Sequence, residues 1–85
     1  MNRRALQRLF RRISQGHHQN VAFNDFVELI EAFGFGYEGS RGSHKSYFRQ
    51  PQCLLVLQPD RGQAKAYQVR QFLRMVERYQ LRMEE

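Results

Sequence analysis

The pattern of apolar and polar positions along the chain predicts three helices. Apolar residues recur every three or four positions, as on one face of an α-helix, in residues 3–14, 24–33 and 66–79. Asn24 is a favourable N-cap for the second of these helices, and Gly34 supplies a left-handed stop after it. The apolar positions of the three helices are Leu6, Leu9, Phe10 and Ile13; Phe26, Leu29, Ile30 and Phe33; and Val69, Phe72, Leu73 and Val76.

Between the second and third helices the pattern changes to that of short strands. We expect strands at residues 35–38, 43–49 and 53–57, with a loop over residues 39–42. The run from Cys53 to Leu57 is continuously apolar, which is typical of a strand covered on both faces. The order helix, three strands, helix, preceded by an extra helix, predicts an α+β fold with a three-stranded antiparallel sheet and helices on one face.

The length of 85 residues indicates one domain. Within it we expect a basic N-terminal helix and connector over residues 1–20, the α-β-β-β-α core over residues 21–81 and a polar tail over residues 82–85. The single Cys53 excludes an internal disulfide framework, as expected in a reducing compartment. No stretch approaches the ~18 apolar residues of a membrane helix, so we expect a cytoplasmic protein without a membrane partner.

The charge balance indicates an anionic partner. Fourteen lysines and arginines stand against eight acids, a formal net charge of +6, and twelve of the fourteen cations are arginine. The planar guanidinium fork suits phosphate or carboxylate, so nucleic acid or an acidic protein is favoured over a neutral metabolite. The asymmetry is strongest between residues 39 and 76, where seven cations accompany the single acid Asp60. This segment is therefore the predicted phosphate-binding surface.

The tripeptide Gly42, Ser43 and His44 is the place where residue types suggest chemistry. Glycines allow a tight turn and a close approach of backbone to ligand, and the imidazole follows where a strand is expected. A histidine held in this way can act as a general base near neutral pH. The adjacent His17 and His18 lie in a polar connector without a carboxylate cluster, so no metal site is expected there.

The last helix adds a second cationic feature. Arg70, Arg74, Arg78 and Arg82 follow one another at four-residue intervals, which predicts a basic ridge about three turns long. Arg61 and Lys65 stand just ahead of this helix, where cations and free amides form a phosphate site. The predicted RNA-binding residues are Arg41, Gly42, Ser43, Lys45, Arg49, Arg61, Lys65, Arg70 and Arg74.

Four stretches resemble the HicA toxins of bacterial toxin-antitoxin pairs, small ribonucleases with a fold like that of double-stranded-RNA-binding domains. These are Leu29-Ile30-Glu31-Ala32-Phe33-Gly34-Phe35, Arg41-Gly42-Ser43-His44, Leu57-Gln58-Pro59-Asp60 and Ala64-Lys65-Ala66-Tyr67-Gln68-Val69-Arg70-Gln71-Phe72. The resemblance covers about residues 20 to 80. In many relatives a second histidine and an aliphatic residue follow the first, whereas this chain has Lys45 and Ser46. The helix over residues 3–14 is an extension beyond the shortest members of the family.

The resemblance implies an mRNA-cleaving toxin in which His44 is catalytic and a HicB antitoxin covers the site. Together with the residues, it predicts metal-independent RNA cleavage without a cofactor, in which His44 takes the proton of a ribose 2′-hydroxyl and Arg41, Lys45 or Lys65 stabilises the phosphorane. Tyr47, a loop histidine and water are the candidate general acids. The alternative functions are a non-catalytic RNA-binding domain and a basic module that binds an acidic protein.

Overall fold

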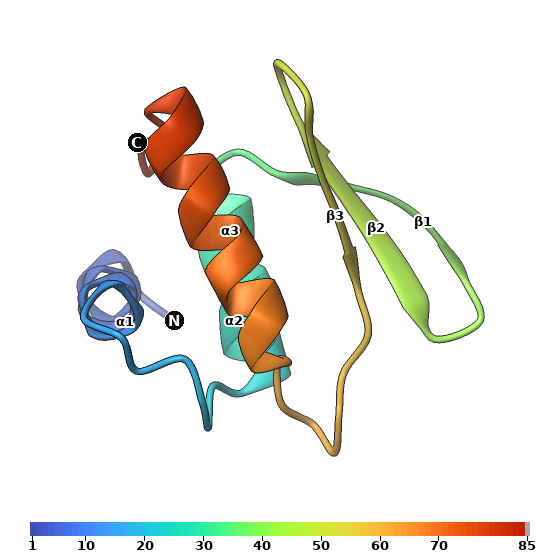
Figure 1. Ribbon diagram of the computed structural model, residues 1–85, viewed down its shortest axis with the longest axis horizontal. Helices are drawn as coiled ribbons and strands as arrows, with labels where there is room; N and C mark the ends of the chain where they lie inside the picture. The colour runs from blue at the N-terminus through green and yellow to red at the C-terminus, as the bar shows by residue number, and fades with distance from the viewer. Residues whose placement is uncertain (85) are drawn as a thin grey trace.

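The computed structural model describes residues 1–84 and contains three helices and one sheet (Figure 1). The three strands form an antiparallel sheet in the order β1-β2-β3, so β2 is central and the other two strands are edges. The predicted α+β class and element order are therefore confirmed. In chain order the elements are α1 (Arg3–Ser14), α2 (Phe23–Ala32), β1 (Gly36–Arg41), β2 (His44–Arg49), β3 (Cys53–Leu57) and α3 (Ala66–Tyr79).

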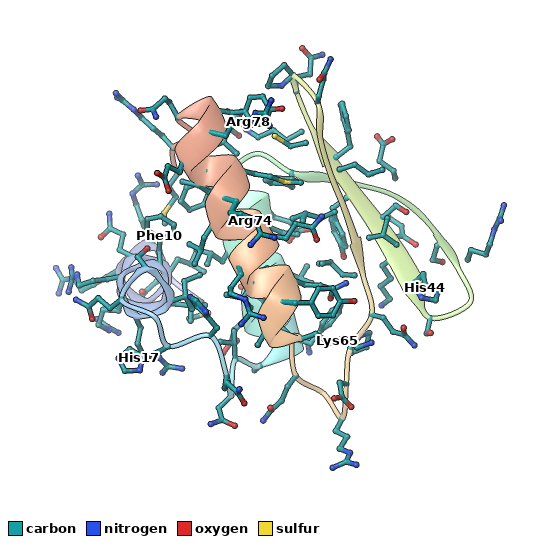
Figure 2. All side chains as sticks on the ribbon, in the orientation of Figure 1. Phe10, His17, His44, Lys65, Arg74 and Arg78 are labelled. Atoms are coloured by element: carbon teal, nitrogen blue, oxygen red, sulfur yellow. The ribbon has the colours of Figure 1, made fainter. Side chains whose placement is uncertain are left out.

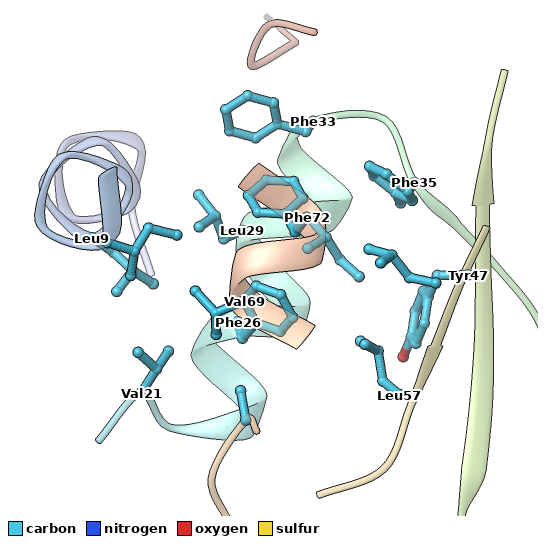
Figure 3. Close-up of a cluster of buried hydrophobic side chains, with 14 of the residues drawn as sticks. Leu9, Val21, Phe26, Leu29, Phe33, Phe35, Tyr47, Leu57, Val69 and Phe72 are labelled. Carbon is cyan, nitrogen blue, oxygen red and sulfur yellow. The ribbon is translucent and has the colours of Figure 1, made fainter. Parts of the chain in front are cut away.

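The elements are stacked in layers, with α2 and α3 lying side by side on one face of the sheet (Figure 1). Helix α1 packs on the other side of the α2–α3 layer, and no helix or strand of residues 1–84 covers the second face of the sheet. Phe72 of α3 is fully buried at the centre of the core (Figure 3). Its ring centroid lies 6.4, 5.6, 5.2 and 6.0 Å from those of Phe10, Phe26, Phe33 and Phe35. These aromatic contacts join all three helices to the start of the sheet.

Helix α1 occupies the expected residues, and its apolar face is buried. Leu6, Leu9 and Ile13 face the core. At its start the Asn2 side chain accepts a hydrogen bond from the Ala5 amide at 2.8 Å, which satisfies one of the free donors of the first turn.

Helix α2 begins one residue before the predicted cap, at Phe23. Asn24 lies inside the helix, and Ala22 is the N-cap with no side-chain hydrogen bond, so the predicted capping role of Asn24 is wrong. The reason is tertiary, because the amide of Phe23 donates to Gly62 and the amide of Ala64 donates to Val21. This pairing with a distant loop fixes the extended backbone at Ala22 and directs the Phe23 ring into the core.

The end of α2 follows the prediction. Gly34 has a φ of 92°, in the left-handed region, and its amide donates to Glu31 while the Phe35 amide donates to Ile30. This pair of hydrogen bonds is a Schellman motif, for which glycine is the preferred residue. The turn directs Phe35 into the core ahead of β1.

The first hairpin is tighter than the sequence pattern predicted. Residues 39 to 41 belong to β1 rather than to a loop, and a two-residue turn of Gly42 and Ser43 joins Arg41 to its Cα partner His44. Gly42 has a φ of 61° and Ser43 is not in the positive-φ region, as in a type II′ hairpin turn. Gly39 marks a β-bulge, which accommodates the extra residue of the longer strand.

The third strand is covered on one face only, so the predicted burial of both faces is wrong. Cys53, Leu55 and Leu57 are buried, whereas Leu54 is 50% exposed and Val56 is 40% exposed. The alternation arises because the helices cover a single face of the sheet.

Candidate nucleic-acid interface

His44 lies at the tip of the β1–β2 hairpin with its side chain exposed (Figure 2). It is the first residue of β2, and it shares a face of the sheet with its Cα partner Arg41. The two-residue turn of Gly42 and Ser43 precedes it directly in sequence. Arg41 and His44 and both residues of the turn are exposed. The structure therefore holds these four predicted residues together on a short, well-defined hairpin.

The next residue, Lys45, points to the other face of the sheet. Successive side chains of a strand alternate between faces, and Lys45 pairs with the buried Leu57. Its Nζ atom lies 6.0 Å from the centroid of the Phe23 ring, at the start of α2. A phosphate held by both His44 and Lys45 would have to lie at the end of the sheet, where the two faces meet.

The loop between β3 and α3 reaches the same end of the sheet as the hairpin tip (Figure 1). The side-chain amide of Gln58 donates a hydrogen bond to Ser43 Oγ at 3.0 Å, which connects the loop to the hairpin turn. Arg61 lies in this loop with a φ of 55°, and Lys65 is the N-cap residue of α3. We call the four cations at this end of the molecule, Arg41, Lys45, Arg61 and Lys65, the sheet-end cations.

Arg49 lies away from this group. It is the last residue of β2, about 16 Å along the strand from His44 at ~3.3 Å per residue. Its Nη1 donates to the backbone oxygen of Gln50 at 2.9 Å, and its buried Nε lies close to Gly34. The structure thus places Arg49 in the packing between β2 and the end of α2.

The basic ridge of α3 is shorter than predicted. Arg70, Arg74 and Arg78 are exposed on the helix (Figure 2), but the helix ends at Tyr79 and Gln80 takes a left-handed conformation. Arg82 therefore lies beyond the helix, where it lines a groove with Phe10 of α1, and its predicted place in the ridge is wrong. The four-residue spacing of the arginines continues to Arg82, but the helical conformation of the backbone ends at Tyr79.

The cations of the described chain are not neutralised by acids. Within residues 1–84 the one ion pair joins the N-terminal ammonium group to Glu28 at 2.6 Å. No lysine or arginine of that range has a carboxylate oxygen of another residue of the same range within 4.0 Å. The positive charge is therefore available to an external anion.

The structure separates two candidate general acids from His44. The Tyr47 side chain is 6% exposed and points from the sheet toward the helices (Figure 3). Because Tyr47 and His44 are three residues apart on β2, strand alternation places their side chains on opposite faces. Burial raises the pKa of its phenol, with Glu31 and Tyr37 contributing in the same direction. His17 lies beside α1, on the far side of the helices from His44 (Figure 2). Tyr47 and His17 are therefore both placed away from His44.

The exposed face of the sheet carries residues that the sequence reasoning missed. His44, Arg41 and Ser46 line a shallow hollow of about 660 Å³ together with Leu54 and Val56. The continuously apolar run from Cys53 to Leu57 predicts Leu54 and Val56 as covered residues, whereas the structure exposes both. The period-two alternation of a sheet covered on one face was the signal that could have identified these residues.

The described residues contain no group of three or more histidine, cysteine, aspartate or glutamate side chains that could hold a metal ion. In the same part of the chain, no helix combines the length and apolarity needed to cross a membrane. Comparison of the sequence and the structure with protein-family models, curated proteins and solved structures finds no match to this chain.

Proposed function

We propose that this protein is a metal-independent endoribonuclease, an mRNA-cleaving toxin of the HicA type. The observation that carries the proposal is the exposed His44 at the hairpin tip, at the end of the sheet where Arg41, Lys45, Arg61 and Lys65 also lie. An imidazole that can accept a proton and several unpaired cations around one site are what cleavage of a phosphodiester requires. The resemblance of residues 20 to 80 to HicA sequences and the α-β-β-β-α order support the same proposal.

In the proposed reaction, His44 accepts the proton of a ribose 2′-hydroxyl. The oxygen then attacks the adjacent phosphorus, and the bond to the 5′-oxygen of the next nucleotide breaks. The products are a 2′,3′-cyclic phosphate and a 5′-hydroxyl, whose proton comes from water. DNA lacks the attacking hydroxyl and survives.

The sheet-end cations supply electrostatic stabilisation. Arg41 lies on the same face as His44, so it is placed to hold the phosphate under attack. Lys45 and Lys65 approach from the helix side and would hold the neighbouring phosphates of the strand. A positioned base contributes about 10²- to 10⁴-fold, and the rest of the rate depends on these contacts and on orientation.

The proposed protein partner is a HicB-like antitoxin. An acidic partner that covered the hairpin tip would neutralise the sheet-end cations and close His44 to RNA in one step. The exposed arginines of α1 and α3 offer the partner further charge complementarity.

The test compares His44→Ala with His17→Ala, a matched control on the far side of the helices (Figure 2). We expect the His44 variant to lose at least about 100-fold in cleavage of a labelled RNA, with unchanged melting temperature and RNA affinity, because the side chain is exposed. The control should cleave like the wild type, and excess EDTA should leave wild-type cleavage intact. Cleavage by His44→Ala within threefold of wild type would remove His44 from the mechanism.

A non-catalytic RNA-binding domain is the second candidate function. It is favoured by the surroundings of His44, since no hydrogen bond among the described residues includes its imidazole, whereas catalytic bases are commonly oriented by a third group. RNA that is bound but not cleaved by the purified protein would establish this function. Failure to bind RNA at low salt would instead favour a module for an acidic protein partner.

A further inference from the structure

The face of the sheet opposite the helices is open and carries an apolar strip. Strand alternation places Phe48 on this face, opposite Leu54 of β3, and Ser46 opposite Val56. Leu54 and Val56 are two of the few large apolar side chains that the fold leaves 40% or more exposed, and they stand on the same strand and the same face. Adjacent apolar side chains on an uncovered sheet face indicate a binding surface rather than scattered exposure.

Strand β1 keeps this face open. Gly36 pairs with Phe48 and Gly39 pairs with Ser46, so β1 contributes no side chain at these two positions. A Cβ atom built on either glycine would meet nothing within 4 Å. A flat group can therefore reach the Phe48 ring and the Leu54 and Val56 side chains from the side of β1.

The strip leads directly to the proposed catalytic histidine. Phe48, Ser46 and His44 alternate along one face of β2 over about 13 Å, at ~3.3 Å per residue. Arg41 lies at the His44 end, and Glu38 is the one acid that lines the hollow. A surface with apolar groups along its length and a cation at its end matches a single strand of nucleic acid, whose bases have flat faces that stack on apolar groups and whose phosphates are anionic.

We propose that this open face, formed by Phe48, Leu54, Val56 and Ser46, is a platform on which bases of single-stranded RNA lie while the adjacent phosphate reaches His44. The inference rests on the proposed ribonuclease function and names its substrate as single-stranded rather than duplex RNA. Bases are accessible for stacking in unpaired RNA, whereas they are stacked on each other inside a helix. Sheets that bind RNA with aromatic side chains hold two or three bases, and a strip of ~13 Å has room for about two.

The test measures binding to the full chain with His44→Ala, so that the RNA stays intact. The probes are an unpaired 12-nucleotide RNA, the same RNA annealed to its complement, and the same RNA with abasic residues at its central positions. We expect the unpaired RNA to bind at least about tenfold more tightly than the duplex. Phe48→Leu should weaken binding of the unpaired RNA between about 5-fold and 150-fold, the range found when one base loses an aromatic partner.

The abasic probe separates base contacts from phosphate contacts. It should bind the Phe48→Leu variant and its parent equally, because neither complex has a base against the ring. Tyr37→Leu is the matched control, since Tyr37 is 55% exposed on the same sheet but pairs with Tyr47 on the helix side. Because Phe48 is partly buried, Leu54→Ser provides a second variant at an exposed position and should weaken binding without a change in melting temperature.

Equal binding of duplex and unpaired RNA, or full affinity in both Phe48→Leu and Leu54→Ser, would overturn the platform while leaving RNA cleavage by the wild type untouched. Base-dependent binding that persists although the wild type cleaves no RNA would support the platform and refute the proposed catalysis. An open face that ignores RNA but is buried by an acidic protein would also overturn the inference, because the apolar strip would then belong to that partner.

Discussion

The salt dependence of RNA binding tests whether the sheet-end cations form the phosphate path. Four cations, Arg41, Lys45, Arg61 and Lys65, lie at the end of the sheet that carries the hairpin tip. The informative perturbation is Lys65→Ala in a His44→Ala background. Lys65 makes no side-chain capping hydrogen bond to α3, so its removal should leave the fold intact.

The magnitude follows from the number of phosphates neutralised. Single strands give a slope of log affinity against log salt of about −0.7 for each phosphate, so four contacts predict about −3 and three predict about −2. A rise from 50 to 200 mM salt should therefore weaken binding about fifty-fold in the parent and about twenty-fold in Lys65→Ala. The loss should be the same for every RNA sequence, since phosphate contacts carry no base readout.

The assay is fluorescence anisotropy with a short unpaired RNA at four or more salt concentrations. Arg4→Ala is the matched control, because Arg4 is an exposed cation of α1, on the far side of the helices from the sheet. It changes the net charge by the same amount and should keep the parent slope. Arg70→Ala, one turn into α3, asks whether the path continues along the helix.

Equal slopes in the parent and in Lys65→Ala would place the RNA path away from the start of α3. A slope that became shallower with Arg4→Ala as much as with Lys65→Ala would mean that binding depends on net charge rather than on the sheet end. Either result would refute the assignment of the sheet-end cations.

Two further predictions concern the fold that holds the hairpin in place. Phe72→Ala should lower the free energy of unfolding by about 3–5 kcal/mol in chemical denaturation, because four aromatic rings surround Phe72. Phe72→Leu should lower it by less. A loss below about 1 kcal/mol in Phe72→Ala would contradict the central place of Phe72 in the core. Burial raises the pKa of Tyr47 above 10.0, so the fold favours the neutral phenol. The neutral phenol of Tyr47 stabilises the fold fully below about pH 10, and this stabilisation is lost as the pH rises through the pKa of the folded state. The melting temperature of Tyr47→Phe should therefore fall less steeply above pH ~10 than that of the wild type. An equally steep fall in both proteins would refute the link between the pKa of Tyr47 and stability.

The helical parts of the fold could be predicted because their signals are local. The spacing of Leu6, Leu9 and Ile13 identified α1, and Gly34 marked the end of α2 because a left-handed residue is needed there. The start of α2 could not be predicted, since pairing of residues 21–23 with the distant residues 62–64 outweighed the capping preference of Asn24. Hairpin geometry was likewise missed, because a two-residue turn and a bulge at Gly39 together satisfy more backbone groups than a four-residue loop.

For the candidate site, the sequence by itself determined the chemistry: a histidine after Gly42 and Ser43, a surplus of arginine, and an α+β order of elements. Tertiary structure alone decided which of these residues meet. Because side chains alternate along β2, His44 and Lys45 lie on opposite faces of the sheet. Arg49 lies at the other end of the same strand, away from His44. Packing of both core helices on one face left Leu54 and Val56 exposed beside His44, because a strand reveals which of its faces is covered only when the layers are assembled.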